Sequence, residues 1–184
     1  IGYGLAPSDI LLCSPTGKAA RRLSEQTDMD ALTVHRALHW TPFGFEYGKD
    51  CKLPNKLVVV DEASMLDIEL AAALVSAIRD DCSLLFVGDV DQLPSVGPGN
   101  VLRDLIAAGV PTARLDTIHR QASESAIPYA AAAIKNGQAP EPGIDVKLHL
   151  VETLSDAREA VSRIVRNRRE TETVQVLSPQ RTTE

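Results

Sequence analysis

The sequence predicts an α/β protein built on a mostly parallel β-sheet. Short apolar runs alternate with segments of helical periodicity along most of the chain, which is the pattern of parallel strands joined by right-handed helical crossovers. Several of these apolar runs end in polar or charged residues, as expected of strands that helices cover and that are open only at their carboxyl ends. The sequence contains no internal repeat and no low-complexity tract.

The first part of the chain predicts a strand, two helices and a loop. Ile10–Cys13 is an apolar run that meets turn-forming residues, and the next segment, Lys18–Gln26, has apolar residues at helical spacing. A second short helix is expected over Thr33–Trp40, with Thr33 as its N-cap. Thr41–Asn55 is rich in glycine, proline and aromatic residues and is most simply a surface hairpin or loop.

The central prediction is a strand, Leu57–Val60, that is buried on both faces and ends in two carboxylates, Asp61 and Glu62. Side chains alternate along an extended strand, so the two acids would take different tasks if the chain stays extended through both. One could hold a metal ion while the other addresses a water molecule, as in sites that cleave phosphoanhydrides. The alternative is a strand followed by a helix N-terminus, where the helix dipole favours acidic residues.

The rest of the chain continues the alternation of strand and helix. A covering helix is expected over Ile68–Arg79 and a buried strand over Leu84–Val87, after which the prolines and glycines of 93–99 exclude regular structure. The remaining expected elements are a helix over Asn100–Ala108, a brief strand over Ala113–Leu115, a helix over Ile127–Asn136 ended by Gly137, a strand over Val146–Val151, a helix over Ser155–Asn167 and a strand over Val174–Leu177.

Composition limits the class of protein. The 184 residues suffice for one large domain or for one domain and part of a second, and the chain starts and stops in a way that leads us to expect a fragment of a longer protein. No apolar run is long enough to span a bilayer and no signal peptide is recognisable, so we expect a cytoplasmic protein without membrane contact. The three cysteines are scattered and indicate neither a disulfide framework nor a zinc site.

The distribution of charge along the sequence is compatible with a local nucleic-acid site. The net charge of −6 argues against attraction of the whole molecule to nucleic acid, but Lys18, Arg21 and Arg22 lie close together. The turn Ser14–Ala19 resembles a phosphate-binding P-loop but lacks its first glycine and its final hydroxyl. A basic turn that opens a helix suits the backbone of a nucleic acid strand, and its alternative is a solvated helix start.

Two further polar residues follow expected strands. Gln92, three residues after Asp89, could contact a terminal phosphate or its attacking water, and its alternative is a loop amide bonded to nearby backbone. Arg120 could neutralise charge on a transferred phosphoryl group, and its alternative is an exposed arginine at a helix start. If the strands are neighbours in one sheet, the clusters at their ends should meet at one edge.

Five ordered segments resemble the motor of RecD-like DNA helicases of superfamily one, the exodeoxyribonuclease V alpha subunit family. They are SPTGKAARRL at 14–23, TVHRAL at 33–38, VVVDEASML at 58–66, LLFVGDVDQLPSVGPG at 84–99 and LDTIHRQ at 115–121. The resemblance implies a truncated RecA-like P-loop NTPase fold of three layers, whose P-loop would precede Ile1. Residues 1–140 would be the first motor domain without its P-loop, and 141–184 a connecting segment and the start of the second motor domain.

The resemblance also implies roles for individual residues. Asp61 would coordinate Mg²⁺, Glu62 would activate the attacking water, Gln92 would sense the γ-phosphate of ATP and Arg120 would reach the phosphates. The residues that would lie along single-stranded DNA are Thr16, Gly17, Lys18, Thr33, His35, Pro94 and Val96. A histidine such as His35 in a short helix is otherwise simply packed or solvated.

The implied parent is an ATP-driven translocase with 5′ to 3′ polarity, with subunits of a recombination nuclease among its partners, and the fragment alone should not hydrolyse ATP. Two alternatives remain: a non-helicase ATPase of the same fold, and a non-catalytic nucleic-acid-binding fragment. Because the P-loop strand is central in such sheets, its absence predicts a gap or unpaired strand edges.

Overall fold

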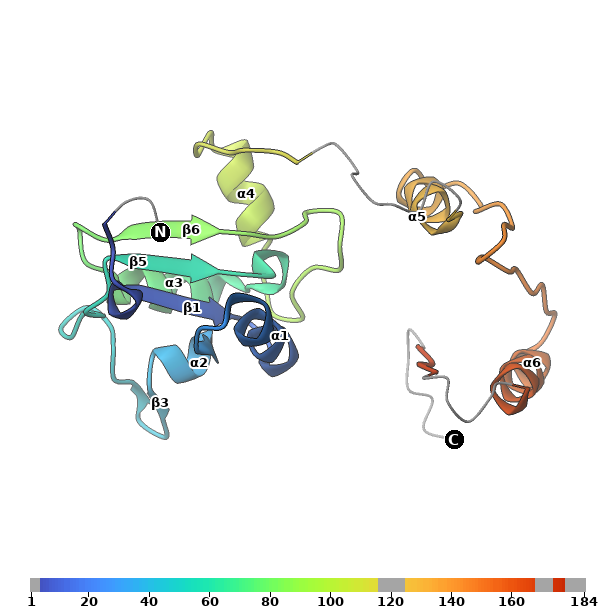
Figure 1. Ribbon diagram of the computed structural model, residues 1–184, viewed down its shortest axis with the longest axis horizontal. Coiled ribbons are helices and arrows are strands. Elements are labelled where there is room, and N and C mark those ends of the chain that lie inside the picture. Colours follow the sequence, from blue (N-terminus) through green and yellow to red (C-terminus); the bar gives the residue numbers. More distant parts are fainter. Residues whose placement is uncertain (1–3, 116–124, 168–173, 178–184) are drawn as a thin grey trace. The chain divides into compact units, whose positions relative to one another are not determined.

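The computed structural model describes residues 4–115, 125–167 and 174–177 of the chain (Figure 1). Backbone contacts divide the chain into two compact units, Ile1–Asp116 and Thr117–Glu184. Each unit is described by itself below.

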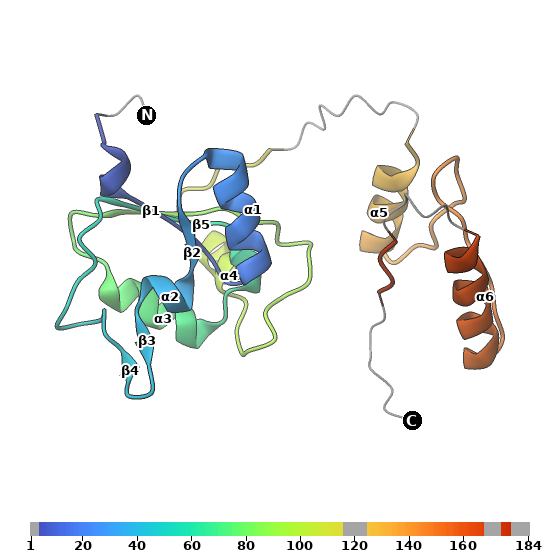
Figure 2. The ribbon, with the colours of Figure 1, turned by 60° about the horizontal axis from the view of Figure 1, so that its bottom comes forward.

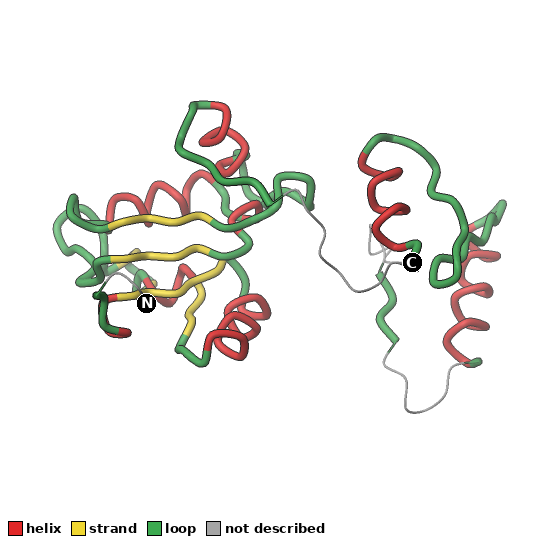
Figure 3. The backbone as a smooth tube through the Cα atoms, turned by 45° about the horizontal axis from the view of Figure 1, so that its top comes forward, coloured by secondary structure: helices red, strands yellow, loops and turns green. Residues whose placement is uncertain are grey.

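The first unit is built on a parallel sheet of four strands. Figure 1 shows neighbouring strand arrows pointing the same way, and Figure 3 shows the strands of the sheet lying side by side. In spatial order the strands are β2 (Ala31–Thr33), β1 (Ile10–Ser14), β5 (Leu57–Val60) and β6 (Ser83–Phe86). The pairing sets Cys13 opposite Val60 and Val60 opposite Phe86. The predicted α/β fold with a parallel sheet is confirmed.

The expected gap in the sheet does not occur among the described strands. β1, β5 and β6 are consecutive neighbours, so the two edges of the sheet are β2 and β6. The prediction that β6 is buried is wrong, because an edge strand has a neighbour on one side only and Leu85 is 50% exposed. The strand β2 was not predicted, since its three residues carry no periodicity and it forms by pairing with β1.

The core lies on one face of the sheet. Val58 and Val60 of β5 are fully buried against α2 (Val34–Ala37) and α3 (Ile68–Ala77), whereas Leu57 and Val59 on the other face are only half-buried. The expectation that β5 is buried on both faces is therefore wrong for one of them. The described helices cover only one face of this strand completely.

Polar side chains start the helices of the first unit. Thr16 caps α1 (Gly17–Thr27), and Asp67 caps α3, where its carboxylate accepts a hydrogen bond of 2.8 Å from Leu70 N. The predicted cap Thr33 is confirmed for α2. The unit also contains the 3₁₀ turns η1 (Pro7–Asp9) and η2 (Ala63–Met65) and the helix α4 (Val101–Ala107).

The helix α2 is shorter than predicted because the chain turns into a hairpin. β3 (Trp40–Thr41) and β4 (Gly44–Phe45) pair antiparallel, which confirms the predicted hairpin (Figure 2). The Thr41 hydroxyl donates to Gly44 O across the turn at 2.9 Å. The antiparallel pairing includes Trp40, which helical periodicity assigns to the end of the helix.

The described residues of the second unit form two helices, α5 (Ile127–Lys135) and α6 (Leu154–Arg166), and both were predicted. Gly137 follows α5 with a φ of +71°, as expected of a residue that ends a helix. No helix in the described part of the chain combines the length and apolar character needed to cross a membrane.

Three predicted strands are wrong. The structure has no strand over Ala113–Leu115, Val146–Val151 or Val174–Leu177, and Leu115 and Leu150 are almost fully exposed. An apolar run becomes a strand only where a neighbouring strand accepts its backbone hydrogen bonds. The described residues supply no such neighbour at these positions.

Replacement of Ser14 tests the packing of the core. Its side chain is fully buried, and its hydroxyl has no hydrogen-bond partner among the described residues. Because an unsatisfied buried hydroxyl is costly, we expect Ser14→Ala to raise the free energy of unfolding by about 1 kcal/mol in urea denaturation. The matched change Ser24→Ala should lower it, because the Ser24 hydroxyl donates to Ala20 O and accepts from Ala31 N. Equal destabilisation by both changes would contradict this account.

Replacement of Gly88, two residues after the end of β6, tests the approach of its loop to η2. A Cβ atom at this position would lie 3.0 Å from both Ala63 N and Leu102 Cδ2. We therefore expect Gly88→Ala to lower the free energy of unfolding by about 1–3 kcal/mol through overpacking. Gly48→Ala is the control, because its Cβ would meet no atom within 4 Å, and a similar loss in both variants would refute the packing argument.

Candidate functional site

The carboxyl ends of β1, β5 and β6 meet at one edge of the sheet, as predicted. Asp61 N donates to Cys13 O at 2.9 Å, which joins the ends of β5 and β1. Val87 N donates to Val60 O at 2.8 Å, and Ala63 N to Val87 O at 2.9 Å, which join the ends of β5 and β6. The polar residues that follow these strands therefore begin at strand ends that are hydrogen-bonded to one another.

Asp61 and Glu62 are half-buried at this edge, but the backbone is not extended through both. β5 ends at Val60, and Glu62 has φ 53° and ψ 39°, a left-handed conformation that is uncommon for a residue other than glycine. Met65 N donates to Glu62 O at 3.0 Å and holds this turn. The strained backbone conformation, and not strand alternation, therefore sets the direction of the Glu62 side chain. Such strain is concentrated at functional sites.

The loop after β6 carries Asp89 and Gln92 at the same edge. The Asp89 carboxylate accepts a hydrogen bond from Asp91 N at 3.0 Å, and Gln92 N donates to Asp89 O at 3.1 Å. Arg103 donates to Val90 O at 3.0 Å and ties the loop to α4. The side chain of Gln92 is exposed, so its amide is accessible to a ligand in solution.

Pro94 and Val96 lie on an exposed loop that is fastened to the start of α3. Ile68 N donates to Pro98 O at 2.9 Å, and a Cβ on Gly97 would lie only 2.6 Å from Asp67 Oδ2. The close approach at Gly97 brings the loop down onto the helix and leaves Val96 fully exposed.

The first two motifs of the expected DNA track lie next to each other. Ser14 pairs with Thr33 between β1 and β2, and a Cβ on Gly17 would lie 4.0 Å from Thr33 Cγ2. The hydroxyl oxygens of Thr16 and Thr33 accept hydrogen bonds from Ala19 N and Arg36 N, at 3.3 and 3.2 Å. Each hydroxyl proton remains able to donate to a phosphate oxygen.

Lys18 is exposed on the first turn of α1 and forms no ion pair within the part of the chain that the structure describes. Arg21, by contrast, pairs with Glu25 at 3.0 Å. Lys18 is therefore the cation of this turn that is open to an anionic ligand.

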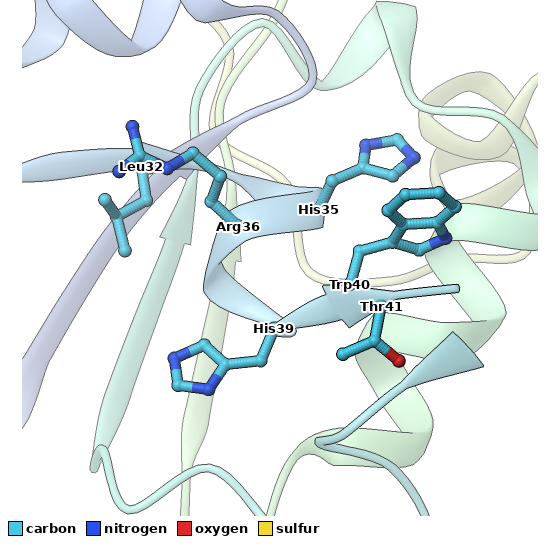
Figure 4. A pocket seen from close by; sticks show the side chains of 6 residues that line it. All are labelled: Leu32, His35, Arg36, His39, Trp40 and Thr41. Carbon is cyan, nitrogen blue, oxygen red and sulfur yellow. The ribbon is translucent and has the colours of Figure 1, made fainter. Parts of the chain in front are cut away.

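His35 is exposed, and its ring contacts Phe45 with ring centroids 5.9 Å apart. It lines a hollow of about 500 Å³ between α2 and the hairpin (Figure 4). The residues that line this hollow are Leu32, His35, Arg36, His39, Trp40 and Thr41. Sequence reasoning missed Arg36, His39 and Trp40 as candidates, and the only signal was the aromatic content of the hairpin loop.

Arg120 lies outside the described residues. Cys13 lies beside the site but is buried, and burial raises the pKa of its thiol to about 12, so the thiol stays protonated at neutral pH. It is therefore a packing residue and not a nucleophile.

The described residues fit a Mg²⁺ site of the kind completed by a nucleotide. They contain no group of three or more His, Cys, Asp or Glu side chains that could enclose a metal by themselves. Mg²⁺ typically uses one or two carboxylates together with waters and phosphate oxygens. Asp61 and Glu62 supply carboxylate oxygens of that kind at the sheet edge.

Comparison with known proteins identifies the family. A family model described as an AAA domain matches residues 4–158. The ATP-dependent RecD2 DNA helicase of Deinococcus radiodurans is 41% identical over 174 residues, which cover 94% of this chain and 24% of that protein.

Two further relatives are more distant. The RecBCD enzyme subunit RecD of Mycolicibacterium smegmatis is 38% identical over 71% of this chain and 27% of its own length. The ATP-dependent DNA helicase dda of Enterobacteria phage T4 is 31% identical over 49% of this chain and 22% of its own length. The chain thus spans about a quarter of the length of these relatives. It belongs to the AAA domain family, and its likeness to RecD-like superfamily one helicases is confirmed.

Proposed function

We propose that this chain is part of an ATP-dependent DNA helicase that couples hydrolysis of Mg-ATP to movement on single-stranded DNA in recombination or repair. The observation that carries the proposal is the meeting of three polar strand ends at one sheet edge. There the Asp61–Glu62 turn lies between the first turn of α1 and the Asp89–Gln92 loop. The relatives named as ATP-dependent DNA helicases support it.

On the nucleotide side, Asp61 would hold Mg²⁺, and Glu62 would take a proton from the attacking water. When bound, Mg²⁺ polarises the terminal phosphate and offsets its charge. Gln92, exposed on the loop after β6, would contact the γ-phosphate, and Arg120 would approach it from a segment outside the described residues. The left-handed turn at Glu62 supports this division of roles, because it separates the Glu62 carboxylate from the path of β5.

On the DNA side, backbone N–H groups and hydroxyls at the starts of α1 and α2 would bind successive phosphates of the strand. Thr16, Gly17 and Lys18 would make the first group of contacts and Thr33 and His35 the second. Pro94 and Val96 would extend the track on the exposed loop before α4. The pairing of Ser14 with Thr33, and the 4.0 Å between Thr33 Cγ2 and the position that a Cβ on Gly17 would take, support a single continuous track, since the two groups adjoin.

Further parts of the proposal concern the complete protein. Residues 1–140 would belong to the first motor domain and 141–184 to a connecting segment and the start of the second. The protein would act in the cytoplasm, and subunits of a recombination nuclease would be among its partners, because several relatives are named as subunits of the RecBCD enzyme. This chain alone would not turn over ATP.

Replacement of Glu62 tests the catalytic role. In the complete gene product, we expect ATP hydrolysis to be stimulated by single-stranded DNA and Glu62→Gln to reduce it by about a hundredfold or more, because the general base is lost. Binding of ATP, measured by calorimetry, should be retained. The control is Glu69→Gln, an exposed glutamate in the first turn of α3. Unchanged turnover in Glu62→Gln would remove this residue from its role, and an ATPase indifferent to DNA would favour a non-helicase ATPase.

Replacement of Lys18 tests the DNA track. We expect Lys18→Ala to weaken the binding of a single-stranded oligonucleotide and to reduce the slope of log affinity against log salt by about 0.7, the value for one lost phosphate contact. Lys56→Ala removes the same charge just before the amino end of β5, at the end of the strands opposite to the site, and should leave the slope unchanged. Equal slopes in both variants would contradict the track.

A further inference from the structure

Apart from His35, the residues that line the hollow between α2 and the hairpin have no role in the function proposed above. Four of its lining residues, His35, Arg36, His39 and Trp40, are exposed, while Leu32 and Thr41 are half-buried. The hollow therefore has an apolar wall, two imidazole rings, one guanidinium and one indole within reach of solvent. This combination of flat rings and a cation is suited to a nucleotide, which offers a base face and an anionic phosphate.

The backbone that carries Trp40 is held in a strained conformation. His39 has a φ of 52°, and the other described non-glycine residues with positive φ are Asp28, which ends α1, and Glu62 in the candidate nucleotide site. His39 O accepts a hydrogen bond from Glu46 N at 3.2 Å, and His39 Nδ1 lies 3.1 Å from Glu46 Oε2. The His39 ring also packs on Tyr47 at 4.9 Å. Contacts from β4 and the residues after it thus maintain the strain and fix the start of the hairpin.

This strained turn presents Trp40 to solvent. The indole is 62% exposed although the residue is paired with Phe45 in the hairpin. Figure 4 shows the Trp40 and His35 rings on one side of α2 and the Arg36 and His39 side chains on the other, and all four line the hollow. A large side chain on a backbone that is fixed by pairing has few torsions left to order when a ligand stacks on its open ring.

Arg36 supplies the charge. Its guanidinium is exposed and makes no ion pair with any residue in the ranges 4–115, 125–167 and 174–177. It follows Thr33 by three residues on α2, and its backbone N–H already donates to the Thr33 hydroxyl at 3.2 Å. A phosphate bound near Thr33 would therefore have this cation one helical turn away.

We propose that this hollow binds one nucleotide of the single strand, with the base stacked on Trp40 and the adjoining phosphate paired with Arg36. The inference rests on the proposed function, because the strand that passes Thr33 and His35 is the ligand that reaches the hollow. Stacking on an indole is tolerant of sequence, so the site would accept any base. It extends the DNA track from the sheet edge to the base of the hairpin.

Trp40 is the single tryptophan of the sequence, so its fluorescence reports on the hollow directly. The experiment titrates the full chain with fluorescently labelled oligothymidylate and follows two signals. Anisotropy of the label measures binding anywhere on the chain, and quenching of Trp40 emission measures stacking. We expect both signals to saturate at the same oligonucleotide concentration.

Variants and a modified oligonucleotide separate base contacts from phosphate contacts. Trp40→Ala should weaken binding by about tenfold, the usual effect of losing one stacked base, and Trp40→Phe should recover most of the loss. Phe43→Ala is the matched control, because Phe43 is a fully exposed aromatic residue of the same hairpin that does not line the hollow. An oligonucleotide with abasic sites should still bind through its phosphates without quenching Trp40.

The outcomes distinguish this proposal from the function on which it rests. Binding by anisotropy with neither Trp40 quenching nor an effect of Trp40→Ala would overturn the stacking site and leave the DNA track intact. Equal quenching by abasic and normal oligonucleotides would also overturn it, because no base would then be needed. Absence of any binding by the wild-type chain would overturn both the track and the hollow.

Discussion

The parallel hydrogen-bonded pairing of β1, β5 and β6 is the interaction on which the site depends. It continues past the strands themselves, through the bonds from Asp61 N to Cys13 O and from Val87 N to Val60 O. The fully buried Val58 and Val60 set the register of β5, because a slip of one residue would turn both valines out of the core. The position of Asp61 is thus determined by apolar packing on the opposite side of the strand.

Close backbone approach, more than ionic pairing, holds the loops around this edge. Gly88 lets the chain after β6 pass directly against η2, and Gly97 lets the following loop rest on Asp67 at the start of α3. Glu62 occupies a left-handed turn directly before η2, the element that Gly88 approaches. The strain at Glu62 is maintained by hydrogen bonds from Met65 N to its carbonyl and from Ala63 N to Val87 O.

A second constrained turn links the helix starts to the hairpin. The α2 helix has only four residues, so its stability comes from its buried Val34 and Ala37 and from the hairpin contacts at its end. His39 is held by Glu46 and Tyr47, and this turn decides where Trp40 lies. The surface from Thr16 through Thr33 and His35 to Trp40 consequently belongs to one unit, and a strand bound along it would cross no boundary between the two units.

Local patterns in the sequence were sufficient for the helices, for the cap at Thr33 and for the family, because capping and helical periodicity depend on residues a few positions apart. Strands depend on distant neighbours, which is why the runs at 113–115, 146–151 and 174–177 were wrongly predicted and β2 was missed. The sequence by itself determined which polar residues follow β1, β5 and β6. The tertiary structure alone decided that these strands adjoin, that Glu62 turns left-handed and that Trp40 lines a hollow, because each depends on contacts between segments far apart in the chain.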